Sequence, residues 1–230
     1  MQYPRHIALI PDGNRTRAKE QGKSGLEGHL EGLQRAIELT NYLFKNTEVE
    51  VFTLRGLSTE NLQQRSEAEL TYLFDIYKKI TEDLYDLLRT YQVNFRVAGD
   101  KSQLPSDLVA FLEEKEQEFS FSTKKTLVLA INYGGQDEIL RAVKKLTANG
   151  EEITKENLEN AMDFAGLPTV DLVIRTKQKL AKRLSGFMLW WIGYAQLYFT
   201  DLYCPEFTVA ELEKAIEQWR WTLENQNFGK

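Results

Sequence analysis

The chain has 230 residues and a formal net charge of −5 at pH 7, so it can bury the core of one large domain and lacks the basic excess typical of nucleic-acid-binding proteins. Its single cysteine, Cys204, excludes an intrachain disulfide framework. The chain does not open on a cationic segment followed by a long apolar one, and no run approaches the roughly 18 apolar residues of a membrane span. We therefore expect a cytoplasmic protein.

Short apolar runs rich in β-branched residues recur along the chain, and most are continuously apolar, as expected of strands buried on both faces of a parallel sheet. The predicted strands are residues 7–10, 49–54, 93–97, 126–131, 171–174 and 197–199. Amphipathic patterns predict helices over about residues 28–44, 67–91, 106–119, 136–147, 155–162 and 209–224. This alternation predicts an α/β fold: a single domain over residues 1–230, with a central, mostly parallel six-stranded sheet flanked by helices.

The first predicted strand runs directly into Asp12-Gly13-Asn14, and a helical pattern containing Arg15 and Arg17 follows. A helix N-terminus binds anions, because its first N–H groups lack partners and the helix dipole is positive there. A carboxylate beside a bound phosphate requires a bridging cation, usually Mg2+. The motif therefore indicates a metal-assisted phosphate or diphosphate site. The alternative is an ordinary turn with Asn14 as the helix N-cap.

Three further polar motifs follow predicted strands, and in an open α/β sheet ligands bind at the C-terminal ends of the strands. These motifs are residues 58–61, residues 132–135, and Arg175-Thr176 followed by Arg183 and Ser185. Arginine pairs suit a diphosphate, because guanidinium groups bind phosphate oxygens bidentately. The alternative for these residues is a surface salt-bridge cluster. The aromatic-rich helix at 67–91 is either a core-packing stripe or one wall of an apolar groove for a long hydrocarbon.

The ordered motifs resemble those of the cis-prenyltransferases, the undecaprenyl diphosphate synthase family, over nearly the whole chain. The resemblance is carried by residues 6–14, Gly28-His29 with Gly32, and residues 58–61, 132–135, 171–176, 183–185 and 190–201. It implies an enzyme that condenses isopentenyl diphosphate onto an allylic diphosphate, such as farnesyl diphosphate, with Mg2+ to give a Z-polyprenyl diphosphate. It also implies an apolar tunnel between the sheet and the helices at 28–45 and 67–91, a homodimer, and peripheral membrane contact during product release.

The same resemblance implies roles for individual residues. Asp12 and Asn61 would be catalytic, and Asp12 would hold Mg2+, with position 196, here Gln196, contributing to the metal site across the dimer. The substrate-binding residues would be Gly13, Asn14, Arg15, Arg17, His29, Ser58, Glu60, Arg65, Arg175, Arg183 and Ser185. Among them, residues 13–15 would hold the allylic diphosphate, and Arg175, Arg183 and Ser185 would hold isopentenyl diphosphate.

Several positions depart from the family pattern. Thr16 and Gly25 stand where basic residues are usual, Gln64 precedes a shifted Arg65, and Gln196 stands where glutamate is usual. Two alternatives follow: a divergent active synthase that has redistributed its charge, or a weakened or non-catalytic polyprenyl diphosphate-binding subunit of a heteromeric prenyltransferase. A second enzyme class, the haloacid-dehalogenase-type phosphatases, fits less well, because Asn14 cannot serve as their second carboxylate.

Overall fold

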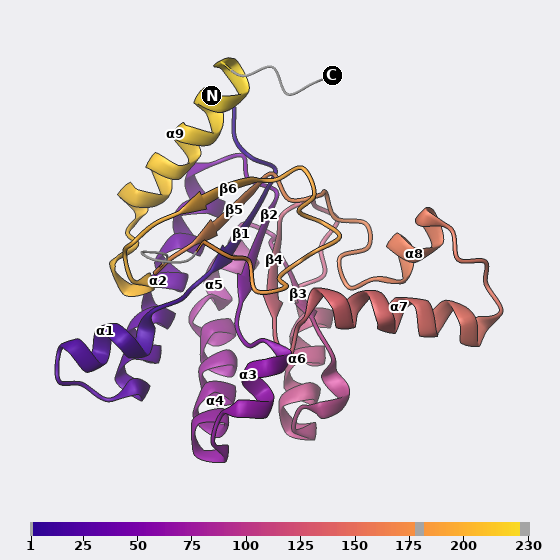
Figure 1. The fold of residues 1–230 in the computed structure, drawn as a ribbon, viewed down its shortest axis with the longest axis horizontal. Helices are drawn as coiled ribbons and strands as arrows, with labels where there is room; N and C mark the ends of the chain where they lie inside the picture. Colours follow the sequence, from indigo (N-terminus) through magenta and orange to yellow (C-terminus); the bar gives the residue numbers. More distant parts are fainter. Residues whose placement is uncertain (1, 178–181, 226–230) are drawn as a thin grey trace.

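The computed structural model describes residues 2–177 and 182–225, and its centre is one six-stranded sheet (Figure 1). The strand order is β3-β4-β2-β1-β5-β6, and every strand pair is parallel. The strands are β1 (His6–Ile10), β2 (Val51–Arg55), β3 (Asn94–Ala98), β4 (Thr126–Ala130), β5 (Leu172–Arg175) and β6 (Gln196–Phe199). The six strands predicted from the sequence are confirmed, with ends that differ by one or two residues.

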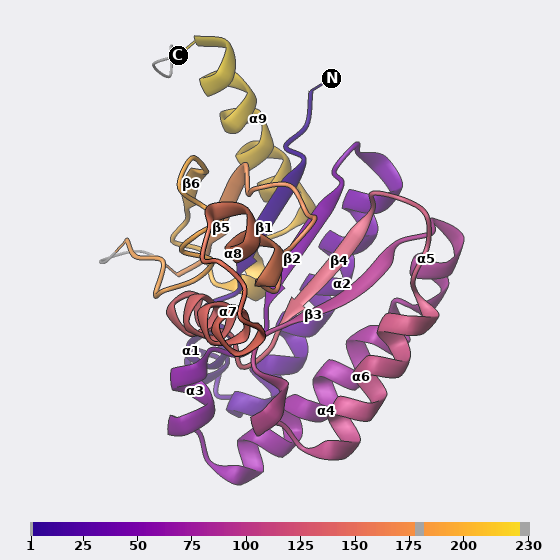
Figure 2. The same cartoon turned by 90° about the vertical axis from the view of Figure 1, so that its right-hand side faces the viewer.

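Helices cover both faces of this sheet (Figures 1 and 2). They are α1 (Asn14–Glu20), α2 (Gly25–Asn46), α3 (Thr59–Gln64), α4 (Glu67–Asp83), α5 (Tyr85–Thr90), α6 (Ser106–Glu118), α7 (Gly135–Asn149), α8 (Lys155–Ala161) and α9 (Val209–Asn225), with short 3-10 turns η1 (Lys101–Gln103) and η2 (Cys204–Glu206). None of the helices within the described residues is long and apolar enough to cross a bilayer.

Alternate residues of β1 pack into two separate cores. Ile7 and Leu9 join the core formed with α2, α4, α5, α6 and α9, whereas Ala8 and Ile10 join the core formed with α7, α8 and residues 182–195. All five residues of β1 are buried, because side chains on both faces of a covered parallel sheet are removed from water. This double coverage explains why the strands are continuously apolar in the sequence.

His6 is the one ionisable group inside β1, and it is fully buried. Its Nδ1 lies 2.8 Å from the Pro168 carbonyl oxygen, and its Nε2 lies 2.8 Å from Thr53 Oγ1. Burial lowers the pKa of His6 to about 4, so the ring is neutral at physiological pH. His6 is therefore a structural residue that joins β1 to β2 and to the loop before β5.

Two predicted local structures are wrong in detail. The helix predicted over 67–91 is two helices, because Leu84 adopts φ −95° and ψ 0° between α4 and α5. Asn14 is not an N-cap. Gly13 holds that position with φ 100°, and a Cβ at Gly13 would lie 2.5 Å from Tyr203 Cδ1, so the left-handed conformation and the close contact both require glycine.

Candidate active site

A cavity of about 530 Å3 lies where β1, β2 and β5 end, at the C-terminal edge of the sheet. All but two of the site residues predicted from the sequence line it. The predicted residues found there are Asp12, Gly13, Asn14, Arg15, His29, Ser58, Glu60, Asn61, Arg65, Arg175, Arg183 and Ser185. The motifs that follow β1, β2 and β5 therefore meet in one place, as expected for the ligand-binding edge of an open α/β sheet.

Arg175 joins two walls of the cavity. Its Nη2 donates to Asp12 Oδ2 at 3.1 Å, while its Nη1 donates to Ser185 Oγ at 2.8 Å and to the Arg183 carbonyl at 2.6 Å. The Arg175 side chain is 5% exposed, whereas the Asp12 side chain is 39% exposed. A buried arginine thus fixes a carboxylate that still presents oxygen to the cavity.

The backbone around Asp12 is held on both sides. Gly13 N–H donates to Asp12 Oδ1 at 2.8 Å, and the Thr176 hydroxyl accepts from Asp12 N–H and donates to the Asp12 carbonyl, both at 2.7 Å. The start of α1 lies directly against α2: a Cβ at Gly32 would lie 2.5 Å from Asn14 Nδ2, and one at Gly28 would lie 2.3 Å from the Asn14 carbonyl oxygen. Glycines in α2 therefore allow the turn at residues 12–14 to approach it closely.

Arg55 is a cavity residue that was not predicted from the sequence. It ends β2, donates to the Ser185 carbonyl at 3.0 Å, and lies over the Phe187 ring at 5.4 Å from its centroid. Burial lowers the pKa of Arg55, and the nearby charge of Arg175 acts in the same direction.

Thr16 and Lys177 also line the cavity, with Lys177 Nζ donating to Thr16 Oγ1 at 2.7 Å. Lys177 thus places a cation beside the position where Thr16 replaces the usual basic residue.

Three side chains from another part of the cavity wall converge on the Glu69 carboxylate, which lies behind that wall. Glu69, near the start of α4, accepts from Arg65 Nη1 at 2.7 Å and lies 3.2 Å from His29 Nε2 and 3.3 Å from Arg15 Nη1. Burial lowers the pKa of His29, and the charges of Arg65 and Arg15 act in the same direction against the opposing effect of Glu69. His29 is therefore neutral at pH 7.

Two predicted site residues lie outside the cavity. Arg17 is not among the described residues that line it, and its guanidinium pairs with Glu31 and with Glu206. A role for Arg17 in substrate binding stays a prediction. Gln196 begins β6, pairs in register with Leu172, and donates from Nε2 to the Trp219 carbonyl at 3.2 Å. It thus lies at the opposite end of the sheet from Asp12 within one chain.

A smaller apolar cavity of about 100 Å3 adjoins the first. Its walls come from α2, α4, β2 and β4, and include Leu33, Ala36, Leu54, Ile80 and Leu129. Both cavities are lined by Pro11, Asn14, His29, Arg55, Gly56 and Arg65. A cationic cavity and an apolar one therefore share one boundary, as the predicted tunnel between the sheet and these two helices requires.

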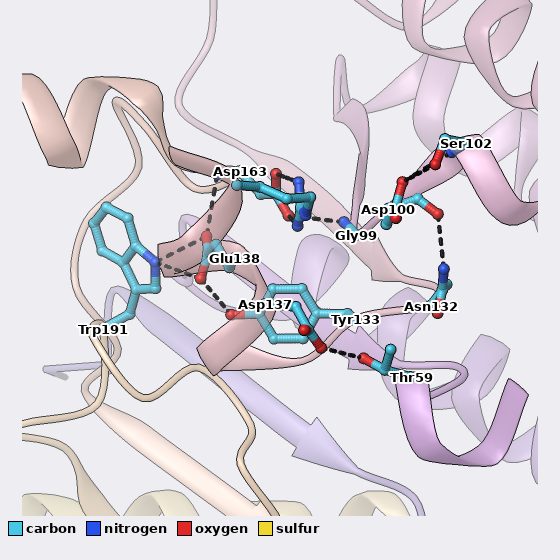
Figure 3. Close-up of polar contacts among 11 residues, drawn as sticks. Thr59, Gly99, Asp100, Ser102, Asn132, Tyr133, Asp137, Glu138, Asp163 and Trp191 are labelled. Atoms are coloured by element: carbon cyan, nitrogen blue, oxygen red, sulfur yellow. Dashed lines mark hydrogen bonds and ion pairs between the residues drawn. The ribbon is translucent and has the colours of Figure 1, made fainter. Parts of the chain in front are cut away.

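A buried polar network lies around the first turn of α7 (Figure 3). Glu138 accepts from the Tyr133 hydroxyl at 2.5 Å and from Trp191 Nε1 at 3.2 Å, and burial raises the pKa of this carboxyl. In the same view, Thr59 Oγ1 donates to Asp137 Oδ2 at 2.9 Å, which ties α3 to the first turn of α7 (Figure 3). Tyr133 pairs with Ser58 in an isolated parallel β-bridge, and Trp191 lies six residues after Ser185, so Glu138 links the neighbourhoods of these two serines.

Comparisons with known proteins identify the family of this chain. The family model described as undecaprenyl diphosphate synthase matches residues 10–229. An isoprenyl transferase of Wolinella succinogenes is 35% identical, over 94% of this chain and 93% of that protein.

Two solved structures also match. Lavandulyl diphosphate synthase from Lavandula x intermedia, solved in complex with dimethylallyl diphosphate, has a TM-score of 0.89 and 29% identity over 99% of both chains. A probable undecaprenyl diphosphate synthase from Campylobacter jejuni has a TM-score of 0.76 and 28% identity over 100% of both chains. Together with the family match, these similarities show that the chain belongs to the undecaprenyl diphosphate synthase family and is a prenyltransferase.

Proposed function

We propose that this prenyltransferase elongates a cis-prenyl chain by condensing isopentenyl diphosphate onto an allylic diphosphate. The observation that carries the proposal is the boundary shared by the cationic cavity and the apolar cavity between α2, α4 and the sheet. An allylic diphosphate has an anionic head and an apolar tail, so it requires such a boundary. The lavandulyl diphosphate synthase structure was solved with dimethylallyl diphosphate, which is itself a short allylic diphosphate.

In this proposal, the allylic diphosphate lies on Gly13, Asn14 and Arg15, and isopentenyl diphosphate is held by Arg175, Arg183 and Ser185. Arg55 completes the second site, because it donates to the backbone at Ser185. The allylic C–O bond breaks, a C–C bond forms to the isopentenyl group, and that group loses one proton. Preorganised arginine and N–H donors stabilise the charge that develops on the departing diphosphate. The apolar cavity shields the allylic carbon from water.

The residues of the cavity fit a Mg2+ ion held jointly with substrate. No group of three or more His, Cys, Asp or Glu side chains suited to a metal is found among residues 2–177 and 182–225. Mg2+ commonly binds one or two carboxylates together with substrate phosphates, and Asp12 presents a partly exposed carboxylate. When bound, Mg2+ supplies positive charge to the leaving diphosphate. Asp12 would hold it, and Asn61, which lines the same cavity, would orient Asp12 or the departing proton.

We also propose a homodimer and peripheral membrane contact during product release. The edge strand β6 and the residues before it expose Leu189, Tyr194 and Leu197, which supports an interface with a second copy. Unpaired edge strands are commonly covered by another chain or element. In such a dimer, Gln196 would contribute to the metal site of the partner, with weaker affinity for Mg2+ than a glutamate would give.

The test is a product-length assay. The purified chain is incubated with farnesyl diphosphate, labelled isopentenyl diphosphate and Mg2+, and the extracted products are resolved by length and double-bond geometry. A ladder of Z-polyprenyl diphosphates that ends at one length is the expected result. A folded protein that binds the diphosphates without incorporation, across several allylic primers and Mg2+ concentrations, would instead be the non-catalytic subunit of a heteromeric prenyltransferase.

A further inference from the structure

One carboxylate, that of Glu69, holds three basic side chains at the cavity wall. Arg15, Arg65 and His29 all line the cavity, and each has a nitrogen within 3.3 Å of Glu69 Oε1. Glu69 itself is not among the described residues that line the cavity. Burial by itself raises the pKa of Glu69. The hydrogen bond with His29 and the charges of Arg65 and Arg15 outweigh this effect, so the pKa of Glu69 lies below its usual value. The side chain is thus an anion at neutral pH.

The contacts of Glu69 compete with those that a diphosphate needs. A guanidinium N–H that donates to Glu69 cannot donate fully to a phosphate oxygen at the same time. The Arg15 side chain is 58% exposed, and ion pairs at exposed sites contribute little, so that contact is easily exchanged. Arg65 is more buried, and its Nε has no hydrogen-bond partner within the described residues, so its present contacts leave one donor unsatisfied.

We propose that Glu69 is an internal counter-ion, which Arg15 and Arg65 exchange for the diphosphate of the allylic substrate. This inference rests on the proposed function, because it requires that the cavity bind a diphosphate. On exchange, the two guanidinium groups turn toward phosphate oxygens, and Glu69 keeps its contact with His29. Glu69 then sets a charge threshold: an anion with several charges displaces it, whereas a weakly charged anion does not. Glu69 is therefore a specificity-determining residue that does not itself contact the substrate.

The test compares Glu69→Gln with Glu67→Gln. Both residues lie in the first turn of α4 and both substitutions remove one negative charge, but Glu67 is exposed and makes no side-chain ion pair among the described contacts. Inorganic pyrophosphate and inorganic phosphate serve as probes in titration calorimetry at fixed ionic strength, in the presence of EDTA. Thermal unfolding of each variant is measured alongside.

For Glu69→Gln we expect pyrophosphate to bind about tenfold more tightly, the effect of one screened like-charge interaction at this range, with a smaller preference for pyrophosphate over phosphate. The melting temperature should fall by about 2–4 °C, because α4 loses its ties to α1 and α2. Glu67→Gln should match the wild type in both respects. A merely structural Glu69 would give lower stability together with weaker binding, and that result would overturn the proposal.

The remaining outcomes separate this inference from the proposed function. If the wild type binds pyrophosphate and Glu69→Gln binds it equally well, the counter-ion role is wrong while the diphosphate site stands. If neither protein binds pyrophosphate, the diphosphate site and the counter-ion role both fail. If only Glu69→Gln binds it, the counter-ion role is supported in its strongest form.

Discussion

Arg175 and Asp12 form an ion pair 3.1 Å long between residues that are 163 positions apart in the chain, and the arginine is almost completely buried while the carboxylate is not. Arg175 is also bonded to the segment that carries Ser185, so it fixes Asp12 relative to the opposite wall of the cavity. The ion pair therefore fixes the position of the Asp12 carboxylate, which remains partly exposed to the cavity.

Asp12→Asn should abolish chain elongation with little effect on the fold. Asparagine keeps the oxygen that accepts from Gly13 N–H but removes the charge that would hold Mg2+ and face Arg175. We expect kcat to fall by about 10²-fold or more. Labelled isopentenyl diphosphate incorporation measures the rate, and circular dichroism confirms folding. Retention of wild-type activity by the folded variant would remove Asp12 from the mechanism.

Arg55→Gln should weaken the binding of isopentenyl diphosphate. Arg55 donates to the Ser185 backbone and stacks on Phe187, so its loss removes a cation and loosens the segment that carries Ser185. The KM for isopentenyl diphosphate should rise by about tenfold, with a smaller change in the KM for the allylic substrate. The control is Arg89→Gln, because Arg89 is exposed, lies over the Tyr85 ring and is not among the described residues that line the cavity. Equal effects of the two substitutions would argue against a role for Arg55.

Gly32→Ala should damage the anion-binding turn without unfolding the protein. A Cβ at residue 32 would lie 2.5 Å from Asn14 Nδ2, so Asn14 must move or α2 must shift. We expect kcat/KM for the allylic substrate to fall by about 10–100-fold, while the free energy of unfolding falls by about 1–3 kcal/mol. Gly193→Ala is the matched control, because a Cβ there meets nothing within 4 Å. Normal kinetics in Gly32→Ala would show that the Asn14 position is not critical.

Ala36→Leu should shorten the products. Ala36 lines the apolar cavity between α2 and α4, so a larger side chain would fill space that the growing prenyl chain needs. The longest product should become shorter by at least one five-carbon unit, with the rate of the first condensation largely retained. Product length is measured by chromatography, with Ala110→Leu, on the exposed side of α6, as control. An unchanged product length would place the prenyl chain elsewhere.

The stability of the fold should depend on pH through His6. Its folded pKa of about 4 lies below the value of 6.5 for the unfolded chain, so only the unfolded state binds this proton between those values. Stability is therefore full above about pH 6.5 and falls as the pH drops toward 4, by up to about 3 kcal/mol from this group. Urea unfolding of the wild type and of His6→Gln at pH 7.5 and pH 5 measures the effect. The two proteins should differ in slope; parallel losses would assign the effect to other groups.

It could be predicted that motifs such as Asp12-Gly13-Asn14 and Arg175-Thr176 lie near one another, because they follow buried strands and the C-terminal ends of parallel strands share one edge of the sheet. The side-chain partners could not. Arg55 looked like the first residue after an apolar run, and only its register with Ala130 shows that β2 continues through it. The family resemblance implies that Arg17 binds substrate, but its partners in the structure, Glu31 and Glu206, lie 14 and 189 positions away and could not be read from the sequence. Glu69 carried no motif at all, because its role depends on how α4 meets α1 and α2.

The all-parallel sheet has a consequence for synthesis on the ribosome. β1 pairs with β2, which follows it closely in the chain, and also with β5, which is made much later. The second edge of β1 therefore stays uncovered until Leu172 has been made and can pair with Ile7. Contacts of such large sequence separation form slowly, and an open strand edge invites wrong pairing meanwhile. A nascent chain released before residue 172 would therefore expose the flank of its innermost strand. The ion pair between Asp12 and Arg175 likewise cannot form until residue 175 has been made, so the geometry around Asp12 is completed late in synthesis, and truncated chains should require chaperone protection.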